Sequence, residues 1–279
     1  MNYTLKRTKR RRVIPGFPLS IGITLAMLSM IVLIPMASIV ICASDLSFDE
    51  FIQIVTAKDV LSGYVVSFSC AFIAAIINCI FGVILAWVLV RYEFPGKRIL
   101  DGLIELPFAL PTAVAGISLT ALYSDKGWIG SIFAKFGIKI AYTKIGITIA
   151  MIFIGIPFVV RAIQPVLEKF DSQYEEAAAM LGASGCRTFL RVIFPEILPA
   201  MLTGFGLALA RGIGEYGSVV FIAGNIPYKT QIAPLLIMAK LEQLKYTDAT
   251  AIALVMLAAS FVILLLINII QVHATKRTT

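Results

Sequence analysis

Long uncharged stretches recur along this chain, separated by shorter segments that hold most of its charged residues. A helix needs about 20 apolar residues to cross a bilayer. Four stretches approach or exceed that length: Val13 to Ser44, Val60 to Val90, Leu106 to Ser124, and Ala249 to the C-terminal tail. The pattern predicts helices that span a membrane.

Two further stretches become spans on closer inspection. Ile145 to Val160 is short, but its helix can extend past Arg161 if that side chain reaches the interface. Ala200 to Ala223 is apolar except for Arg211 and Glu215. With these two, the sequence predicts an all-α polytopic membrane protein of six transmembrane helices, with both termini on the same side.

The first apolar stretch follows a basic segment, KRTKRRR, as a signal peptide would. A signal h-region has about 7 to 15 residues and ends at a small-residue cleavage site. The stretch here is much longer and shows no such site. We expect residues 1–16 to form a basic tail and residues 17–44 to form a retained first helix.

Composition supports a membrane protein, since 59% of the residues are hydrophobic and 14% are charged, unlike most soluble domains. The net charge of +8 follows topology. Arginines outside the spans lie in the tail, in Arg91 to Asp101, in Arg161 to Glu196 and in residues 273–279, whereas the opposite segments hold lysines only. The positive-inside rule places both termini in the cytoplasm. Basic residues divided among loops do not favour a nucleic-acid partner.

Few residues are suited to catalysis or metal binding. The four cysteines, Cys42, Cys70, Cys79 and Cys186, lack C-x-x-C spacing, and His273 is the single histidine. Small apolar packing residues explain the cysteines better than a metal site. The sequence also lacks a G-x-x-x-x-G-K-[ST] P-loop. We therefore expect no catalytic residue, no metal and no cofactor in this chain.

The segment ARGIGEYGSVV, Ala210 to Val220, contains a G-x-G-x-x-G pattern at Gly212, Gly214 and Gly217. A dinucleotide site requires a strand before the pattern and an acidic residue about 20 positions later. This segment lies in an apolar span, and IAPLLI stands at that later position. Small residues such as Gly204, Ala208 and Gly212 instead form a face for close helix packing.

Arg211 and Glu215 remain to be explained, because one such charge costs about 2.5 to 3.5 kcal/mol at the bilayer centre. A spacing of four places both on one helix face, where pairing lowers the cost. The pair either pins neighbouring helices or lines a translocation path. The glycines, Gly214 among them, favour the path slightly because they permit bending.

Pro107 and Pro111 interrupt the third stretch, and Glu105 lies at its start. Prolines free backbone carbonyls, which is tolerated at depth where protein or a cavity supplies partners. We expect this span to be interior and to contribute to the path or its gate. Kinked inner helices with a buried charge pair indicate a transporter or channel more often than an enzyme.

A cytoplasmic loop, Asp171 to Pro199, predicts a helical hairpin. Ser172 and Glu175 fit a capping box, and the helix should end at Gly182. Ser184 should cap a second short helix that Pro195 stops. Four apolar residues suggest a docking surface on this hairpin: Met180, Leu181, Phe189 and Phe194.

This loop resembles the E-A-A-x-x-x-G motif of permease subunits of binding-protein-dependent ABC importers. The matching positions are Glu176, Ala177, Ala178, Gly182, Phe189, Ile193, Pro195 and Pro199. The resemblance implies a permease fold, residues 60–272, whose coupling loop, residues 164–199, fits a groove on a separate ATPase subunit. ATP and Mg would then be bound by that partner.

Two longer segments, ELPFALPTAVAGISLTALYSDKGWIG and ARGIGEYGSVVFIAGNIPYKTQIAPLLI, resemble T-type permease subunits of sulfate and thiosulfate importers. The resemblance implies a bacterial inner-membrane location. It also implies three kinds of partner: a homologous W-type permease, an ATPase dimer and an external sulfate-binding protein.

We expect alternating access, in which ATPase closure moves the hairpin and the anion passes between two permeases. We also expect exchange of Arg211 and Glu215 to preserve more transport than loss of either charge. A molybdate or tungstate permease is the nearest alternative. An ion-coupled secondary transporter should show broken helices in two repeated halves, and a membrane enzyme would have only Asp101 and Glu105 as nearby carboxylates.

Overall fold

A computed structural model of the protein describes residues 17–275, which form helices joined by turns and contain no strand. The predicted basic tail, residues 1–16, and residues 276–279 lie outside the described residues. Five helices are long and apolar enough to cross a membrane, and a bent helix pair makes a sixth candidate. The predicted all-α membrane architecture is confirmed.

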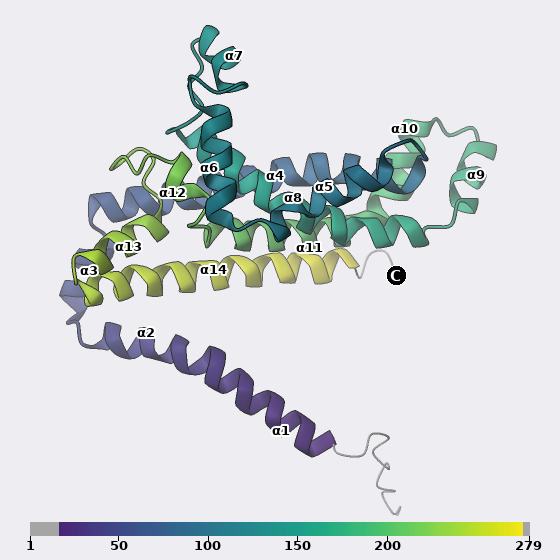
Figure 1. The fold of residues 1–279 in the computed structure, drawn as a ribbon. Coiled ribbons are helices and arrows are strands. Elements are labelled where there is room, and N and C mark those ends of the chain that lie inside the picture. Colours follow the sequence, from purple (N-terminus) through teal and green to yellow (C-terminus); the bar gives the residue numbers. More distant parts are fainter. Residues whose placement is uncertain (1–16, 276–279) are drawn as a thin grey trace, which may run out of the picture.

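The first candidate span comprises α1 (Phe17–Leu28), a π-helical turn η1 (Ser29–Leu33) and α2 (Ile34–Ser44). Its apolar side chains are largely exposed, and α1 diverges from the rest of the molecule (Figure 1). A short helix, α3 (Phe48–Val55), follows it. Ser47 and Glu50 form a capping box there, and the Ser47 hydrogen bonds lower the pKa of the Glu50 carboxyl.

Four long helices form the bundle: α4 (Lys58–Arg91), α8 (Lys144–Lys169), α11 (Phe194–Ile213) and α14 (Tyr246–Thr275). Glycines set the close approaches between them. A Cβ added to Gly204 would lie 2.7 Å from the Cα of Val159, and one on Gly212 would lie 3.3 Å from the Cβ of Ala71. The predicted small-residue face is confirmed as a packing surface. Helix α8 continues past Arg161, as predicted.

The third predicted span is not one straight helix. Helix α5 (Lys97–Ala109) and α6 (Thr112–Tyr123) meet at an angle of 114°. Pro111 restricts the preceding residue to extended backbone, and Leu110 has φ −85° and ψ 134°. In Figure 1, α6 rises away from the bundle with α7 (Gly130–Lys135) near its tip.

The prediction that Pro195 ends a helix is wrong. Helix α10 (Gly185–Thr188), the π-helical turn η2 (Phe189–Ile193) and α11 form one continuous span, Gly185–Ile213. A proline lacks an N–H and its ring crowds the carbonyl four residues earlier. In η2 the Phe194 N–H donates to the Phe189 carbonyl, an i→i+5 bond that widens the helix just before Pro195. Turn η1 precedes Pro35 in the same way.

The predicted span Ala200 to Ala223 is therefore shifted. Helix α11 ends at Ile213, Gly214 is its C-cap, and the chain runs irregularly to α12 (Val219–Ile222). Helix α13 (Ala233–Glu242) then precedes α14. Glu215 thus lies in a turn beyond the helix end, between Gly214 and Gly217.

Figure 1 shows the loop with α9 (Gln173–Met180) and α10 at one end of the bundle, and α3 and α13 at the other. The C-terminal end of α14 and the start of α1 both point toward the α9–α10 end. This agrees with an even number of crossings, whereas the side of the membrane on which that end lies remains a prediction.

Candidate functional site

The α9–α10 loop is a helical hairpin, as predicted. Helix α9 (Gln173–Met180) is followed by its C-cap, Leu181, and then by Gly182, which has a φ of +77°. Gly182 N–H donates to the Ala179 carbonyl (2.9 Å), and Ala183 N–H donates to the Ala178 carbonyl (3.0 Å). These two bonds form a Schellman motif, in which glycine accepts the left-handed conformation without strain.

The predicted capping box at Ser172 is wrong. The Ser172 side chain makes no capping bond; instead, Asp171 Oδ1 accepts a hydrogen bond of 3.0 Å from the Gln173 N–H. Glu175 cannot serve as the reciprocal partner because its carboxylate pairs with Arg91, at the end of α4. A tertiary ion pair thus replaces the local interaction.

The predicted docking surface is smaller than expected. Met180 and Leu181 are 90% and 88% exposed. Phe189 and Phe194, however, are half-buried against the core cluster. Phe189 packs edge-on against Trp87 of α4, with 5.5 Å between ring centroids. The turn of the hairpin is apolar and exposed, and its second arm belongs to the bundle.

The other predicted coupling residues follow the same division. Glu176 and Ala177 are exposed on α9, and Ala178 is half-buried. Pro195 lies in the first turn of α11, half-buried after the π-helical turn. The structure therefore places the E-A-A segment and Gly182 on an accessible element, while Phe189 and Pro195 build its base.

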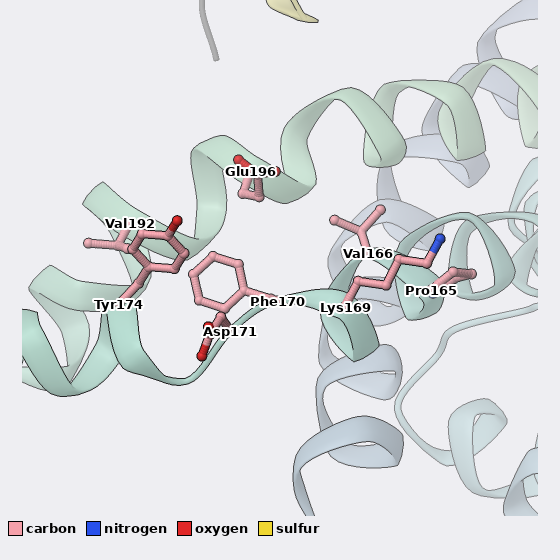
Figure 2. A pocket seen from close by; sticks show the side chains of 8 residues that line it. All are labelled: Pro165, Val166, Lys169, Phe170, Asp171, Tyr174, Val192 and Glu196. Carbon is pink, nitrogen blue, oxygen red and sulfur yellow. The ribbon is translucent and has the colours of Figure 1, made fainter. Parts of the chain in front are cut away.

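A pocket of about 720 Å³ opens at the base of the hairpin, between the end of α8 and α11. Figure 2 shows Tyr174 and Val192 on one side and Pro165, Val166 and Lys169 on the other. Phe170, Asp171 and Glu196 complete its lining. The hollow separates the end of α8 from Tyr174 of α9 and Val192 of η2.

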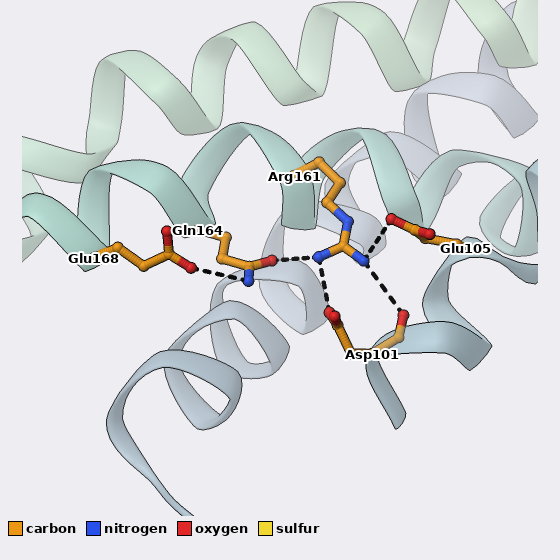
Figure 3. Close-up of polar contacts among 5 residues, drawn as sticks. All are labelled: Asp101, Glu105, Arg161, Gln164 and Glu168. Atoms are coloured by element: carbon orange, nitrogen blue, oxygen red, sulfur yellow. Dashed lines mark hydrogen bonds and ion pairs between the residues drawn. The ribbon is translucent and has the colours of Figure 1, made fainter. Parts of the chain in front are cut away.

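A polar network joins α5 to α8 at the same end of the bundle (Figure 3). Arg161 Nη1 lies 2.8 Å from Asp101 Oδ1, and Nη2 lies 2.7 Å from Glu105 Oε1. Gln164 also accepts a bond from Arg161 and donates to Glu168 (3.1 Å). Asp101 and Glu105 are therefore occupied in fastening α5 to α8.

Arg211 and Glu215 form the ion pair that their spacing predicted. The surroundings of the two charges differ, since Glu215 is 1% exposed, whereas the Arg211 side chain is 35% exposed. Glu215 Oε1 also accepts hydrogen bonds from the Ser218 N–H (2.8 Å) and hydroxyl (2.9 Å). The site is built for a carboxylate at position 215. That exchange of the two charges preserves more transport than loss of either one stays a prediction.

The turn that holds Glu215 packs against the start of α6. A Cβ on Gly217 would lie 2.1 Å from Thr112 Oγ1, and one on Gly116 would lie 2.4 Å from the Ser218 carbonyl oxygen. Of the predicted path residues, Gly214 belongs to this turn and Pro111 directly precedes Thr112. Pro107 is buried in α5. The two helix breaks thus lie side by side.

The ion pair lies deep in the bundle, because Gly212 contacts Ala71 of α4. At 1.5 Å per residue, Ala71 is about 20 Å from the start of α4 and about 30 Å from its end. Among the described residues, no group of three or more His, Cys, Asp or Glu is arranged to hold a metal ion. What the geometry offers is an accessible hairpin at one end and paired helix breaks within the bundle.

Comparison with known proteins assigns the class. Residues 78–279 match the family model of the binding-protein-dependent transport system inner membrane component, and the chain belongs to this family. It is a permease component of a transport system in the inner membrane, not an enzyme.

Particular relatives lie within the same class. The chain is 53% identical to a probable sulfate transport system permease protein of Chlorokybus atmophyticus, over 89% of this chain and 87% of that protein. It is 46% identical to the sulfate transport system permease protein of Salmonella typhimurium, over 96% of each. A bacterial ABC transporter that imports the acidic polysaccharide alginate has the same fold, with a TM-score of 0.77 and 14% identity, covering 92% of this chain and 96% of that one.

Several residues at these sites escaped prediction from the sequence. Arg91, Ser218, Thr112 and Gly116 make contacts that depend on segments far apart in the chain or on an unpredicted turn. A signal existed for Arg91, which ends an apolar run near Trp87. The sequence around Gly116 gave no sign that the Ser218 carbonyl would lie where a side chain at position 116 would project.

Proposed function

We propose that this chain is a permease subunit of an ATP-driven importer for sulfate and thiosulfate, working with a homologous W-type permease. The observation that carries the proposal is the combination of high identity to named sulfate permeases with an exposed E-A-A hairpin. The preference for sulfate over molybdate or tungstate rests on those relatives.

The hairpin is the proposed point of contact with an ATPase dimer, which binds ATP and Mg. Its Schellman turn holds Met180 and Leu181 almost fully exposed, and exposed apolar side chains of this size favour a protein partner. Glu176, Ala177 and Ala178 lie on the preceding helix, and Gly182 sets the turn. Movement of this hairpin would be passed to α11 through η2, because Phe189 and Pro195 belong to the same continuous helix.

The paired helix breaks are the proposed path or gate. Arg211 is partly exposed beside the turn of Gly214 and Glu215, and α6 leaves the bundle directly after Pro111. This chain would therefore line one side of the translocation path, and the second permease would line the other. Pro107 and Pro111 allow the bend that places α6 against this turn.

The remaining predictions extend the same proposal. Both termini would lie in the cytoplasm with the hairpin, and a sulfate-binding protein would dock on the opposite face. That face is formed by the outer loops, residues 45–59, 125–144 and 226–248. An external binding protein would provide selectivity for the anion. Among the described residues we find no group of cationic side chains around Arg211 that could coordinate an anion deep in the bundle.

Reconstitution of the complete complex in vesicles tests the coupling. We expect accumulation of labelled sulfate only with ATP on the hairpin side and binding protein on the other. Gly182→Trp should abolish it, because a bulky side chain is added where the ATPase would dock. Accumulation driven by an ion gradient without ATP would instead indicate a secondary transporter.

A further inference from the structure

The cytoplasmic end of α4 contacts both arms of the hairpin. Trp87 and Arg91 are four residues apart on α4 and therefore share a face. Arg91 pairs with Glu175 of α9, and Trp87 packs against Phe189 of η2 at 5.5 Å. One face of α4 thus contacts the first arm of the hairpin, α9, through an ion pair, and the second arm, at η2, through an aromatic contact.

Arg91 is held by more than its ion pair. Its guanidinium lies 5.3 Å from the centre of the Trp87 ring and 5.9 Å from that of Phe170, which joins α8 to α9. Its side chain is 22% exposed, and that of Glu175 is 30% exposed. Cation–π contacts and partial burial make such a pair stronger than a surface salt bridge. A cation in the last turn of α4 also faces the negative end of the helix dipole.

This ion pair is the principal polar link of α9. Within residues 17–275, the Glu175 bond to Arg91 is the one side-chain hydrogen bond described between α9 and a membrane-spanning helix. Tyr174 adds a ring contact of 5.7 Å, but its partner is Phe170 in the connector. The pocket at the base of the hairpin lies between the end of α8 on one side and Tyr174 of α9 on the other. Besides its chain connections to α8 and α10, α9 is therefore linked to the bundle through Arg91 of α4.

Helix α4 leads from this contact to the paired helix breaks. It packs through Gly82 against Val159 of α8, and through Ala71 against Gly212 of α11. Gly212 directly follows Arg211 in the chain. A Cβ added to Gly82 would lie 2.6 Å from Val159 Cγ1, and one on Gly212 would lie 3.3 Å from the Cβ of Ala71. Because packing this close transmits strain, a shift of α4 would move its neighbours.

We propose that Trp87 and Arg91 form a clamp that makes α4 receive the movement of the coupling hairpin. Arg91 holds α9, Trp87 holds η2, and the two arms move with α4 as one unit. The residues act as positioning residues for transport. The inference rests on the proposed function, in which the hairpin docks on an ATPase.

The test uses Glu175→Gln in the complete transporter, because this change removes the charge from the outer arm and leaves the packed face of α4 intact. We expect normal association with the ATPase subunit and continued ATP hydrolysis. Sulfate transported per ATP hydrolysed should fall several-fold, because the amide oxygen can still accept from Arg91 but without the charge, and a charge-assisted hydrogen bond is about twice as strong as a neutral one.

The matched control is Glu93→Gln, at the same end of α4. Glu93 pairs with Lys97 in the α4–α5 connection, so its change should leave the transport-to-hydrolysis ratio at the wild-type value. A Trp87→Leu variant provides a second measurement that does not alter charge. It should lower the same ratio.

The outcomes separate the two proposals. If the wild-type chain does not bind an ATPase subunit, the proposed function fails. If it binds and transports, but Glu175→Gln and Trp87→Leu both keep the wild-type ratio, the clamp is wrong and the proposed function stands. Loss of association in Glu175→Gln, with hydrolysis and coupling unchanged in whatever complex forms, would also overturn the clamp, since Glu175 would then be a docking residue.

Discussion

The carboxylate of Glu215 is fully buried, and its three interactions all suit an anion. Arg211 supplies a charge, and Ser218 supplies an N–H and a hydroxyl. An arginine at position 215 would place its guanidinium N–H groups against the Ser218 N–H, where neither group could accept a hydrogen bond. The buried site therefore distinguishes between the two members of the ion pair.

Glu215→Ala should destabilise the folded protein by about 3 to 5 kcal/mol, toward the lower end because Arg211 is partly exposed. Glu215→Gln should cost less, since its amide oxygen can still accept from Ser218. Thermal unfolding of the purified protein in detergent measures both. Glu242→Ala, at an exposed carboxylate in α13, is the control and should leave the melting temperature unchanged. Equal melting temperatures for Glu215→Ala and wild type would show that the buried pair does not support the fold.

Gly217→Ala should reduce transport strongly, because the added methyl group would lie 2.1 Å from Thr112 Oγ1. Thr112→Ala in the same chain should recover part of the loss by removing that hydroxyl. Gly102→Ala is the matched control, since open space surrounds Gly102. Uptake of labelled sulfate, normalised to the amount of protein in the membrane, measures the three variants. Full uptake in Gly217→Ala would mean that the two helix breaks do not need their close contact.

At the scale of elements, the apolar pattern predicted the spans well but not their breaks. Length and hydropathy are local properties, so α4, α8 and α14 were found with small errors at their ends. Pro195 was interpreted as a stop, although a π-helical turn accommodates it. Glu215 was placed on a helix that ends at Ile213. In both cases tertiary packing chose between conformations that the local sequence permits.

The local features of the candidate site were predicted from the sequence, but its contacts between distant segments were not. Gly182 and the Arg211–Glu215 pair follow from short-range rules and were found. The contacts of Arg91 with Glu175 and of Gly217 with Thr112 join distant segments, and no periodicity in one sequence reports them. Phe189 was expected to be exposed. Its ring partner, Trp87, lies in another helix, so the local sequence does not reveal the contact.

Gly182→Val should impair coupled transport, because a β-branched residue is strained at a φ of +77°. The left-handed conformation costs a non-glycine residue about 1 to 2 kcal/mol. Gly185→Val is the control, since Gly185 lies in α10 without positive φ or close neighbours. ATP hydrolysis and sulfate uptake in the reconstituted complex should both fall for Gly182→Val, and neither for Gly185→Val. Similar values for the two variants would show that the turn is not a constraint on coupling.

At the scale of the whole molecule, the chain has the form of part of an assembly. Helix α1 diverges from the bundle, and α6 extends from it (Figure 1). Trp128 and Phe136, beyond α6, are 87% and 77% exposed. The exposed helices α1 and α6, and the exposed aromatic side chains beyond α6, fit a protein that contacts lipid and other subunits. This agrees with its membership of a family of transport-system components.

Uptake of labelled sulfate in cells with and without this chain tests the central proposal most directly. We expect deletion to abolish uptake, the restored gene to recover it, and excess unlabelled molybdate to compete little in cells that contain the chain. Unchanged sulfate uptake after deletion, with molybdate accumulation lost instead, would contradict the sulfate assignment while leaving the permease family intact.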